Sequence, residues 1–123
     1  MAWNLTADRP IYLQLIEEIE LRVVTGVYGP GEKLPSVREL AAEAAVNPNT
    51  MQRALAELET TGVVNTQRTS GRFVTRNSGL LDSYRRQLAE QYIGEFLQKI
   101  EPLGYSPEEV LDMVKRIREE EDG

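Results

Sequence analysis

Hydrophobic positions recur with a helical period through most of the first half of the chain. The first stripe has spacings of three and four residues and predicts a helix that begins after Asp8, with Pro10 in its first turn, and ends near Gly26. Asp8 is the expected N-cap of this helix. A stretch rich in glycine and proline, residues 27–34, then predicts a loop. The apolar positions of the stripe are Tyr12, Leu15, Ile16, Ile19 and Val23.

Two short helices follow, joined by a tight connection. Ser36 and Glu39 fit a capping box that opens the first of them, which is about two turns long. Asn47 is a suitable N-cap for the second helix, with Pro48 at its first helical position. The expected buried positions are Val37, Leu40 and Ala41 in the first helix and Met51, Ala54, Leu55 and Leu58 in the second.

The pattern changes after Gly62 from a helical to a strand-like one. Two runs of β-forming residues, 63–66 and 73–75, flank a polar stretch that contains Gly71. This arrangement predicts a short hairpin. A hairpin that follows two helices of this kind is the wing of a winged helix-turn-helix.

The helical period returns beyond a short hinge at residues 78–79. One long apolar stripe follows, and Pro102 and Gly104 end it. A further helix is expected from Ser106, because a cap, a proline and two acidic residues favour a helix N-terminus there. The first stripe consists of Leu81, Tyr84, Leu88, Tyr92, Phe96 and Ile100, and the second of Val110, Leu111, Val114 and Ile117.

The composition argues against several classes of function. The chain has 123 residues without cysteine or histidine, so it lacks thiolate metal ligands, a disulfide framework and the commonest general base. We therefore expect that the protein is not an enzyme and binds no metal or cofactor. The acidic residues 119–122 are expected to form a solvated terminus. The N-terminus shows no secretory signal, and no apolar run reaches the roughly 20 residues that cross a bilayer, which favours a cytoplasmic protein.

The net charge of −6 is unevenly distributed along the chain. Residues 77–123 hold six basic and eleven acidic side chains, whereas residues 30–76 hold six basic and five acidic ones. Screening limits attraction between exposed charges to about 10 Å at 0.1 M salt, so the position of the arginines matters more than the total. The acidic balance therefore leaves double-stranded DNA open as a partner, although it argues against strong nonspecific binding.

The second of the two short helices carries a polar and basic face opposite its buried stripe. Asn49, Thr50, Gln52 and Arg53 stand on its first turns, the part of a helix-turn-helix that enters the major groove. Their amide, hydroxyl and guanidinium groups are suitable partners for base edges or phosphates. The alternative is an ordinary exposed helix surface.

A series of short motifs also stands in a fixed order along residues 10–75. They are Pro10-Ile11-Tyr12, Pro30-Gly31, LPSVRELA at residues 34–41, VNPNT at residues 46–50, Arg53-Ala54, Leu58-Glu59, Gly62 and GRFV at residues 71–74. This series resembles the winged DNA-binding domain of the GntR family of bacterial transcription regulators. The short helical tail, residues 77–123, is similar to that of the YtrA-type subfamily, whose tails mainly dimerise.

The resemblance implies a fold that is mainly α with a small β-hairpin wing. It divides the chain into a winged helix-turn-helix domain, residues 1–76, and a helical dimerisation region, residues 77–123. It also implies a sequence-specific DNA-binding regulator. In the family, Arg38 is an arginine that reaches DNA, and the alternative is a solvated side chain paired with Glu39 or Glu43. The residues expected at DNA are Ser36, Arg38, Asn47, Asn49, Thr50, Gln52, Arg53, Arg68, Gly71 and Arg72, with Ser36 and Asn47 acting first as caps.

The wing departs from the family pattern. Members often carry a Gly-x-Gly tip, and here the first glycine position is Thr69, followed by Ser70 and Gly71. Whether the backbone of this tip enters the minor groove is therefore open. Arg68 and Arg72 are the expected compensation, because a narrow minor groove attracts arginine. Loose surface arginines are the alternative.

The two C-terminal stripes offer more apolar surface than the N-terminal domain can cover. The excess predicts a homodimer, which would place two reading domains on a pseudo-palindromic operator. A small-molecule effector remains open, although no polar cluster in the tail marks a pocket. The expected interface residues are Leu81, Tyr84, Leu88, Tyr92, Phe96, Ile100, Leu111 and Val114.

Three classes of function remain. The first is a transcriptional repressor that acts on nearby transporter genes, as the subfamily resemblance suggests. The second is a winged protein-interaction module without DNA binding, which predicts that substituting Arg38 or Arg53 leaves function intact. The third, an enzyme that uses carboxylates alone, is the least favoured, because the adjacent acids at residues 17–18 and 108–109 point to different sides of their helices.

Overall fold

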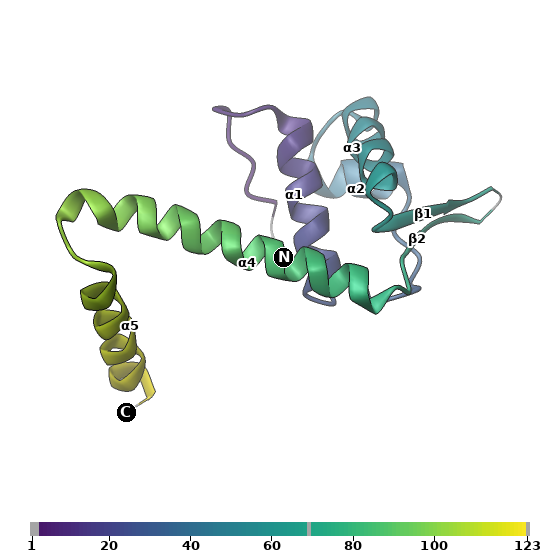
Figure 1. Cartoon of the computed structure of the whole chain (residues 1–123). Coiled ribbons are helices and arrows are strands. Elements are labelled where there is room, and N and C mark those ends of the chain that lie inside the picture. Colours follow the sequence, from purple (N-terminus) through teal and green to yellow (C-terminus); the bar gives the residue numbers. More distant parts are fainter. Residues whose placement is uncertain (1–2, 69, 123) are drawn as a thin grey trace. The chain divides into compact units, whose positions relative to one another are not determined.

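The computed structural model describes residues 3–68 and 70–122 of the chain. Its contacts group these residues into an N-terminal unit that ends at Arg85 and a C-terminal unit that begins at Arg86. The predicted fold class, mainly α with one β-hairpin, is confirmed (Figure 1). The elements are α1 (Ile11–Val24), α2 (Val37–Ala44), α3 (Pro48–Thr61), β1 (Val64–Gln67), β2 (Gly71–Val74), α4 (Ser78–Ile100), a 3-10 turn (Glu101–Leu103) and α5 (Pro107–Asp122).

The core of the N-terminal unit lies between α1, α2 and α3, with the hairpin extending from one side (Figure 1). The predicted stripe of α3 is fully buried, and Val37 of α2 is only half-buried. The dense core holds the three helices in one arrangement, because each apolar side chain removed from water contributes about 1.5–3 kcal/mol. The buried apolar residues are Leu15, Ile19, Val23, Leu34, Leu40, Ala41, Ala44, Met51, Ala54, Leu55, Leu58, Val63, Val64 and Val74.

The predicted caps of α2 and α3 form, but the predicted cap of α1 is wrong. Asn47 Oδ1 accepts a hydrogen bond from the Asn49 amide at 2.8 Å, and Ser36 Oγ accepts one from the Glu39 amide at 3.2 Å. The Glu39 carboxylate accepts from the Ser36 hydroxyl, so the two side chains bond to each other. The N-cap of α1 is Pro10, and the carboxylate of Asp8 instead accepts from the hydroxyl of Thr6.

A left-handed residue makes the turn between α2 and α3. Ala45 caps α2 with φ 57° and ψ 46°, and the amide of Val46 donates to the carbonyl of Ala41 at 3.0 Å. This conformation costs an L-residue with a Cβ about 1–2 kcal/mol. The helix-turn-helix therefore carries a strained residue where a glycine would fit without strain.

The wing is a two-stranded antiparallel hairpin in which Val64 pairs with Val74 and Gln67 with Gly71. The loop before α2 adds to it, because Lys33 bridges to Phe73 and the amide of Leu34 donates to the carbonyl of Arg72 at 2.9 Å. The segment predicted as a plain loop thus lies along β2. This pairing attaches the wing to the start of α2.

A buried arginine links α1 to α2. Arg22 is 2% exposed, and its guanidinium lies 3.0 Å from a carboxylate oxygen of Glu43 and 3.3 Å from one of Glu18. It also donates to the hydroxyl of Tyr28 at 3.0 Å and stacks 4.3 Å from the ring of Trp3. The Arg22 guanidinium holds the pKa of Glu43 below its usual value. A buried charge is tolerated only when it is paired in this way.

The two parts of the predicted tail have different surroundings. Leu81 and Tyr84, on the first turns of α4, pack against the core of the N-terminal unit. In the C-terminal unit, Ser106 and Glu109 form the full reciprocal capping box of α5, with bonds of 3.0 and 3.2 Å. Among the described residues of this unit, only Val110 is buried. None of the helices in the described ranges has the length and apolarity that a membrane span requires.

Candidate nucleic-acid interface

The first turns of α3 present polar side chains to solvent. Asn49, Gln52 and Arg53 are exposed and Thr50 is half-buried, whereas Met51 on the opposite face is fully buried. The buried face fixes the rotation of the helix against the core, so the polar face is held outward. This is the arrangement that the sequence predicted for a helix that enters the major groove.

Arg53 is held from both sides. Its guanidinium carbon lies 3.5 Å from the centroid of the Tyr12 ring, and its Nε lies 3.8 Å from a carboxylate oxygen of Glu57 one turn along α3. The arginine side chain is still 60% exposed. The apolar period of α1 includes Tyr12 and does not predict this contact, which depends on how α1 packs against α3.

Arg38 is exposed on α2, and the two acids expected to compete for it have other partners. Glu43 pairs with Arg22, and Glu39 accepts from Ser36. Within the described ranges, no ion pair or hydrogen bond holds the guanidinium of Arg38. Its donors are therefore available to a ligand outside the chain, which favours the DNA-contact role over the surface ion pair.

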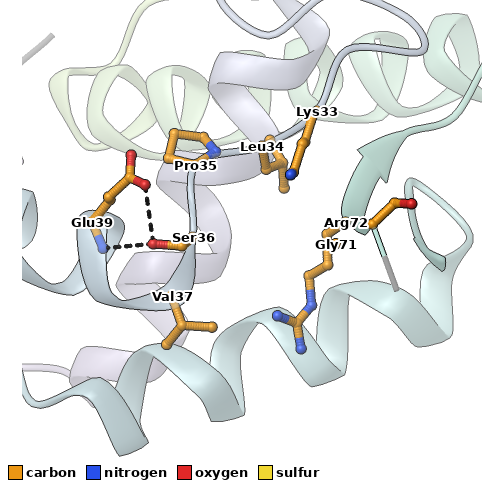
Figure 2. Close-up of a pocket in the computed structure, with 9 residues that line it drawn as sticks. Lys33, Leu34, Pro35, Ser36, Val37, Glu39, Gly71 and Arg72 are labelled. Carbon is orange, nitrogen blue, oxygen red and sulfur yellow. Dashed lines mark hydrogen bonds between the residues drawn. The ribbon is translucent and has the colours of Figure 1, made fainter. Parts of the chain in front are cut away.

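A hollow separates the N-terminus of α2 from the wing. Figure 2 shows Ser36 and Glu39 on one side of it, Gly71 and Arg72 on the other, and Lys33 between them with its side chain near Gly71. Lys33 was not among the predicted site residues, although it stands beside the quoted LPSVRELA motif. The hollow is thus lined by the ammonium of Lys33 and the guanidinium of Arg72 as well as by the carboxylate of Glu39.

The glycine and the arginine of β2 have structural roles that the sequence analysis did not foresee. Gly71 has φ 102°, and a Cβ built on it would come within 3.0 Å of Cε of Lys33. Arg72 is half-buried and forms an ion pair with Glu59 on α3. The pKa of Glu59 lies below its usual value. The main cause is a hydrogen bond from the Thr66 side chain, and the pairing with Arg72 adds to it. Arg72 thus ties the wing to α3, and a phosphate contact would require this pair to open.

At the tip of the wing, the structure describes Arg68 and Ser70, both exposed. Thr69, which stands at the first glycine position of the family pattern, lies outside the described residues. The structure thus brings the start of α2, the first turns of α3 and the wing into one unit. The predicted residues Ser36 and Asn47 lie in it as caps whose side chains already have partners.

The predicted interface residues fall into two groups. Leu81 and Tyr84 belong to the N-terminal unit and pack within their own chain. In the C-terminal unit, the remaining side chains are half-buried or exposed to solvent. Leu88 and Ile100 are half-buried, and Tyr92, Phe96, Leu111 and Val114 are exposed.

Three packed helices with a helix-turn-helix, followed by a hairpin that stands beside the reading helix, define a winged helix-turn-helix DNA-binding protein. The family model for bacterial regulatory proteins of the gntR family matches residues 11–74. The chain belongs to this family. It is accordingly a DNA-binding transcriptional regulator and not an enzyme, and the resemblance seen in its motifs is confirmed.

Relatives of known sequence and structure extend the similarity into the tail. The chain is 38% identical over 113 residues to the uncharacterized HTH-type transcriptional regulator YhcF of Bacillus subtilis. The aligned residues make up 92% of this chain and 93% of YhcF. The chain is 35% identical over 105 residues to the HTH-type transcriptional repressor YtrA of the same organism, covering 76% and 81%. A solved GntR family transcriptional regulator from Listeria monocytogenes has 38% identity and a TM-score of 0.84, over 91% of this chain and 98% of that one.

Proposed function

We propose that this protein is a transcriptional repressor that binds a pseudo-palindromic operator as a homodimer. One observation carries the DNA-reading part of the proposal: the polar face on the first turns of α3 is exposed while its apolar face is fully buried. Membership of the GntR family supports DNA as the target, and the similarity to the repressor YtrA supports repression. As a bacterial regulator it would meet this target in the cytoplasm.

The proposed reading surface combines three parts of the N-terminal unit. Asn49, Gln52 and Arg53 are suitable for base edges, because amides pair with adenine and guanidinium groups with guanine. Arg38 and Lys33, at the start of α2, are suitable for phosphates. Arg68 on the wing would reach the adjacent minor groove or its phosphates.

The proposed dimer rests on the C-terminal unit. Four large apolar residues are exposed there by 41% to 56%: Phe96 of α4 and Leu111, Val114 and Ile117 of α5. Several large apolar side chains exposed on two helices of one small unit favour a protein interface. A second copy would cover these side chains and would also double the number of phosphate contacts, which a DNA-reading unit without a net positive charge requires. Control of nearby transporter genes is proposed on the subfamily resemblance alone.

Selection of bound duplexes from a random DNA library, with the full chain at about 150 mM salt, tests this function. At this salt concentration nonspecific phosphate attraction is already weakened. We expect enrichment of an inverted repeat, and folded, dimeric protein that enriches no sequence would contradict the proposal and favour the interaction module.

Substitutions on the selected operator then test the site. Arg53→Ala is expected to weaken specific binding by about 1–3 kcal/mol if Arg53 reads a base, and to weaken all sequences alike, with a shallower salt dependence, if it holds phosphate. Arg86→Ala is the matched control, because it removes one exposed arginine from the C-terminal unit. Equal affinity of Arg53→Ala and the parent would remove Arg53 from the site.

A further inference from the structure

We propose that Tyr12 is a positioning residue for DNA recognition, which acts by stacking beneath Arg53. The inference deepens the proposed function and rests on it. Recognition of DNA by the polar face of α3 does not by itself require an aromatic residue on α1. The structure nevertheless places one directly against a side chain of the reading helix.

Tyr12 does not serve the core. Its neighbours on α1, Ile11 and Ile16, pack against the buried cluster, whereas Tyr12 lies outside that cluster within the described part of the chain. Its ring is half-buried, with the guanidinium carbon of Arg53 3.5 Å from its centroid. The ring therefore covers the arginine rather than filling the space between the helices.

Stacking leaves the hydrogen-bonding edge of Arg53 available. A guanidinium attracts the negative face of an aromatic ring through its own flat face, and its five N–H donors lie in the plane of the group. Glu57 approaches only Nε, at 3.8 Å. In the described ranges, no other hydrogen bond or ion pair engages the two terminal nitrogens. They are free for bidentate recognition of guanine or phosphate.

The physical effect is preorganisation. An unsupported arginine on an exposed helix loses rotamer freedom when it binds, and this loss of entropy weakens the affinity. Tyr12 restricts the arginine before DNA arrives. Because α1 packs directly against α3, the ring is held by the fold rather than by the arginine alone.

Four variants of the full chain test the idea on the selected operator duplex: Tyr12→Phe, Tyr12→Leu, Arg53→Ala, and Tyr12→Leu combined with Arg53→Ala. Tyr12→Phe keeps the ring and is expected to bind within about 2-fold of the parent. Tyr12→Leu is expected to weaken operator binding by about 2- to 13-fold, because the binding step would then bear the ordering of the Arg53 side chain. Where Arg53 is already alanine, the same change should alter affinity by less than about 2-fold, because the two positions form one double-mutant cycle.

Three results would overturn the proposal. Tyr12→Leu could bind like the parent, or it could weaken binding equally with and without Arg53, which would show that the ring acts independently of the arginine. Tyr12→Phe could be as weak as Tyr12→Leu, which would assign the effect to the phenol hydroxyl. Thermal melting of each variant accompanies the titrations, and Tyr12→Met, which keeps an apolar side chain of similar length, replaces Tyr12→Leu if that variant does not fold.

The proposed function and this inference fail differently. If the parent selects no DNA sequence, the proposed function is wrong and the role of Tyr12 falls with it. If the parent selects an operator and Arg53→Ala binds it as well as the parent does, the function stands and the role of Tyr12 is wrong. A coupling between Tyr12 and Arg53 on a selected operator supports both.

Discussion

The N-terminal and C-terminal units contain helices with similar apolar stripes, yet these stripes have different surroundings. In the N-terminal unit, Leu15, Leu40 and Leu55 are fully buried. In the C-terminal unit, Phe96, Leu111 and Val114 are exposed. Among the described residues of that unit, Val110 alone is buried. The difference shows that an apolar stripe predicts a helix and a buried face, but does not indicate whether the same chain provides the cover.

The largest expected effect is the loss of stability when a buried leucine of the N-terminal unit is truncated, compared with an exposed leucine of the C-terminal unit. Leu55→Ala should lower the free energy of unfolding of the N-terminal unit by about 2–5 kcal/mol, because it leaves a cavity in a packed core. Leu111→Ala, at an exposed position, should change the free energy of unfolding of the N-terminal unit by less than about 0.5 kcal/mol. Urea unfolding followed by the fluorescence of Trp3, the single tryptophan, measures both, since Trp3 packs against this core. Equal losses would mean that the two units are not separate in stability.

A charge placed on the exposed stripe should break the proposed dimer. Phe96→Glu is expected to raise the dimer dissociation constant about 30-fold or more, which corresponds to about 2 kcal/mol, because the charge would lose its water in the interface. Gln98→Glu adds the same charge on the opposite side of α4 and should leave the dimer intact. Sedimentation or light scattering over a concentration series measures the difference. A Phe96→Glu protein that stays dimeric at the parent's concentrations would place the interface elsewhere.

The turn of the helix-turn-helix offers a gain in stability. Ala45→Gly should stabilise the N-terminal unit by about 0.5–1 kcal/mol, because glycine adopts the observed φ of 57° without strain while losing more entropy on folding. Ala42→Gly, in the interior of α2, is the control and should destabilise by about 1 kcal/mol. Thermal melting of both variants checks the signs. A destabilised Ala45→Gly would show that entropy outweighs the strain.

The smallest expected effect is on how the free energy of unfolding falls at acid pH. The pKa of Glu59 is lowered in the folded state from an ordinary value of 4.5, so its stabilising contribution is complete above that pH and is lost as the pH falls below it. Glu59→Gln should therefore lose less stability than the parent between pH 6 and about pH 3. Glu109 of α5, whose pKa is lowered by bonds to Ser106, is the control in the other unit. Glu109→Gln should leave the Trp3-detected profile unchanged; a changed profile would show that the units are coupled.

Much of the fold could be predicted because it depends on local signals. Asn47 caps α3, Ser106 caps α5, and the change of period after Gly62 predicts the hairpin. Asp8 failed as a cap because Pro10 stands at the N-cap position and Asp8 bonds to Thr6 instead. Local preference alone does not decide between two nearby polar partners.

The candidate site could be predicted only in outline. The polar face of α3 follows from its period, whereas the roles of Arg72 and Tyr12 do not. Arg72 pairs with Glu59, which lies thirteen positions away in the chain. Tyr12 meets Arg53 across the α1–α3 packing. Such contacts join residues that no sequence period relates.

The sequence by itself determined the class of this protein, the order of its helices and hairpin, and the side chains that face outward on α3. The tertiary structure decided which of those side chains are held and by what: Arg53 by Tyr12, Arg72 by Glu59, and Glu43 by Arg22, which leaves Arg38 without an acidic partner among the described residues. The physical reason is range. Caps and periods act over a few residues, while stacking and ion pairs act wherever packing brings two segments together.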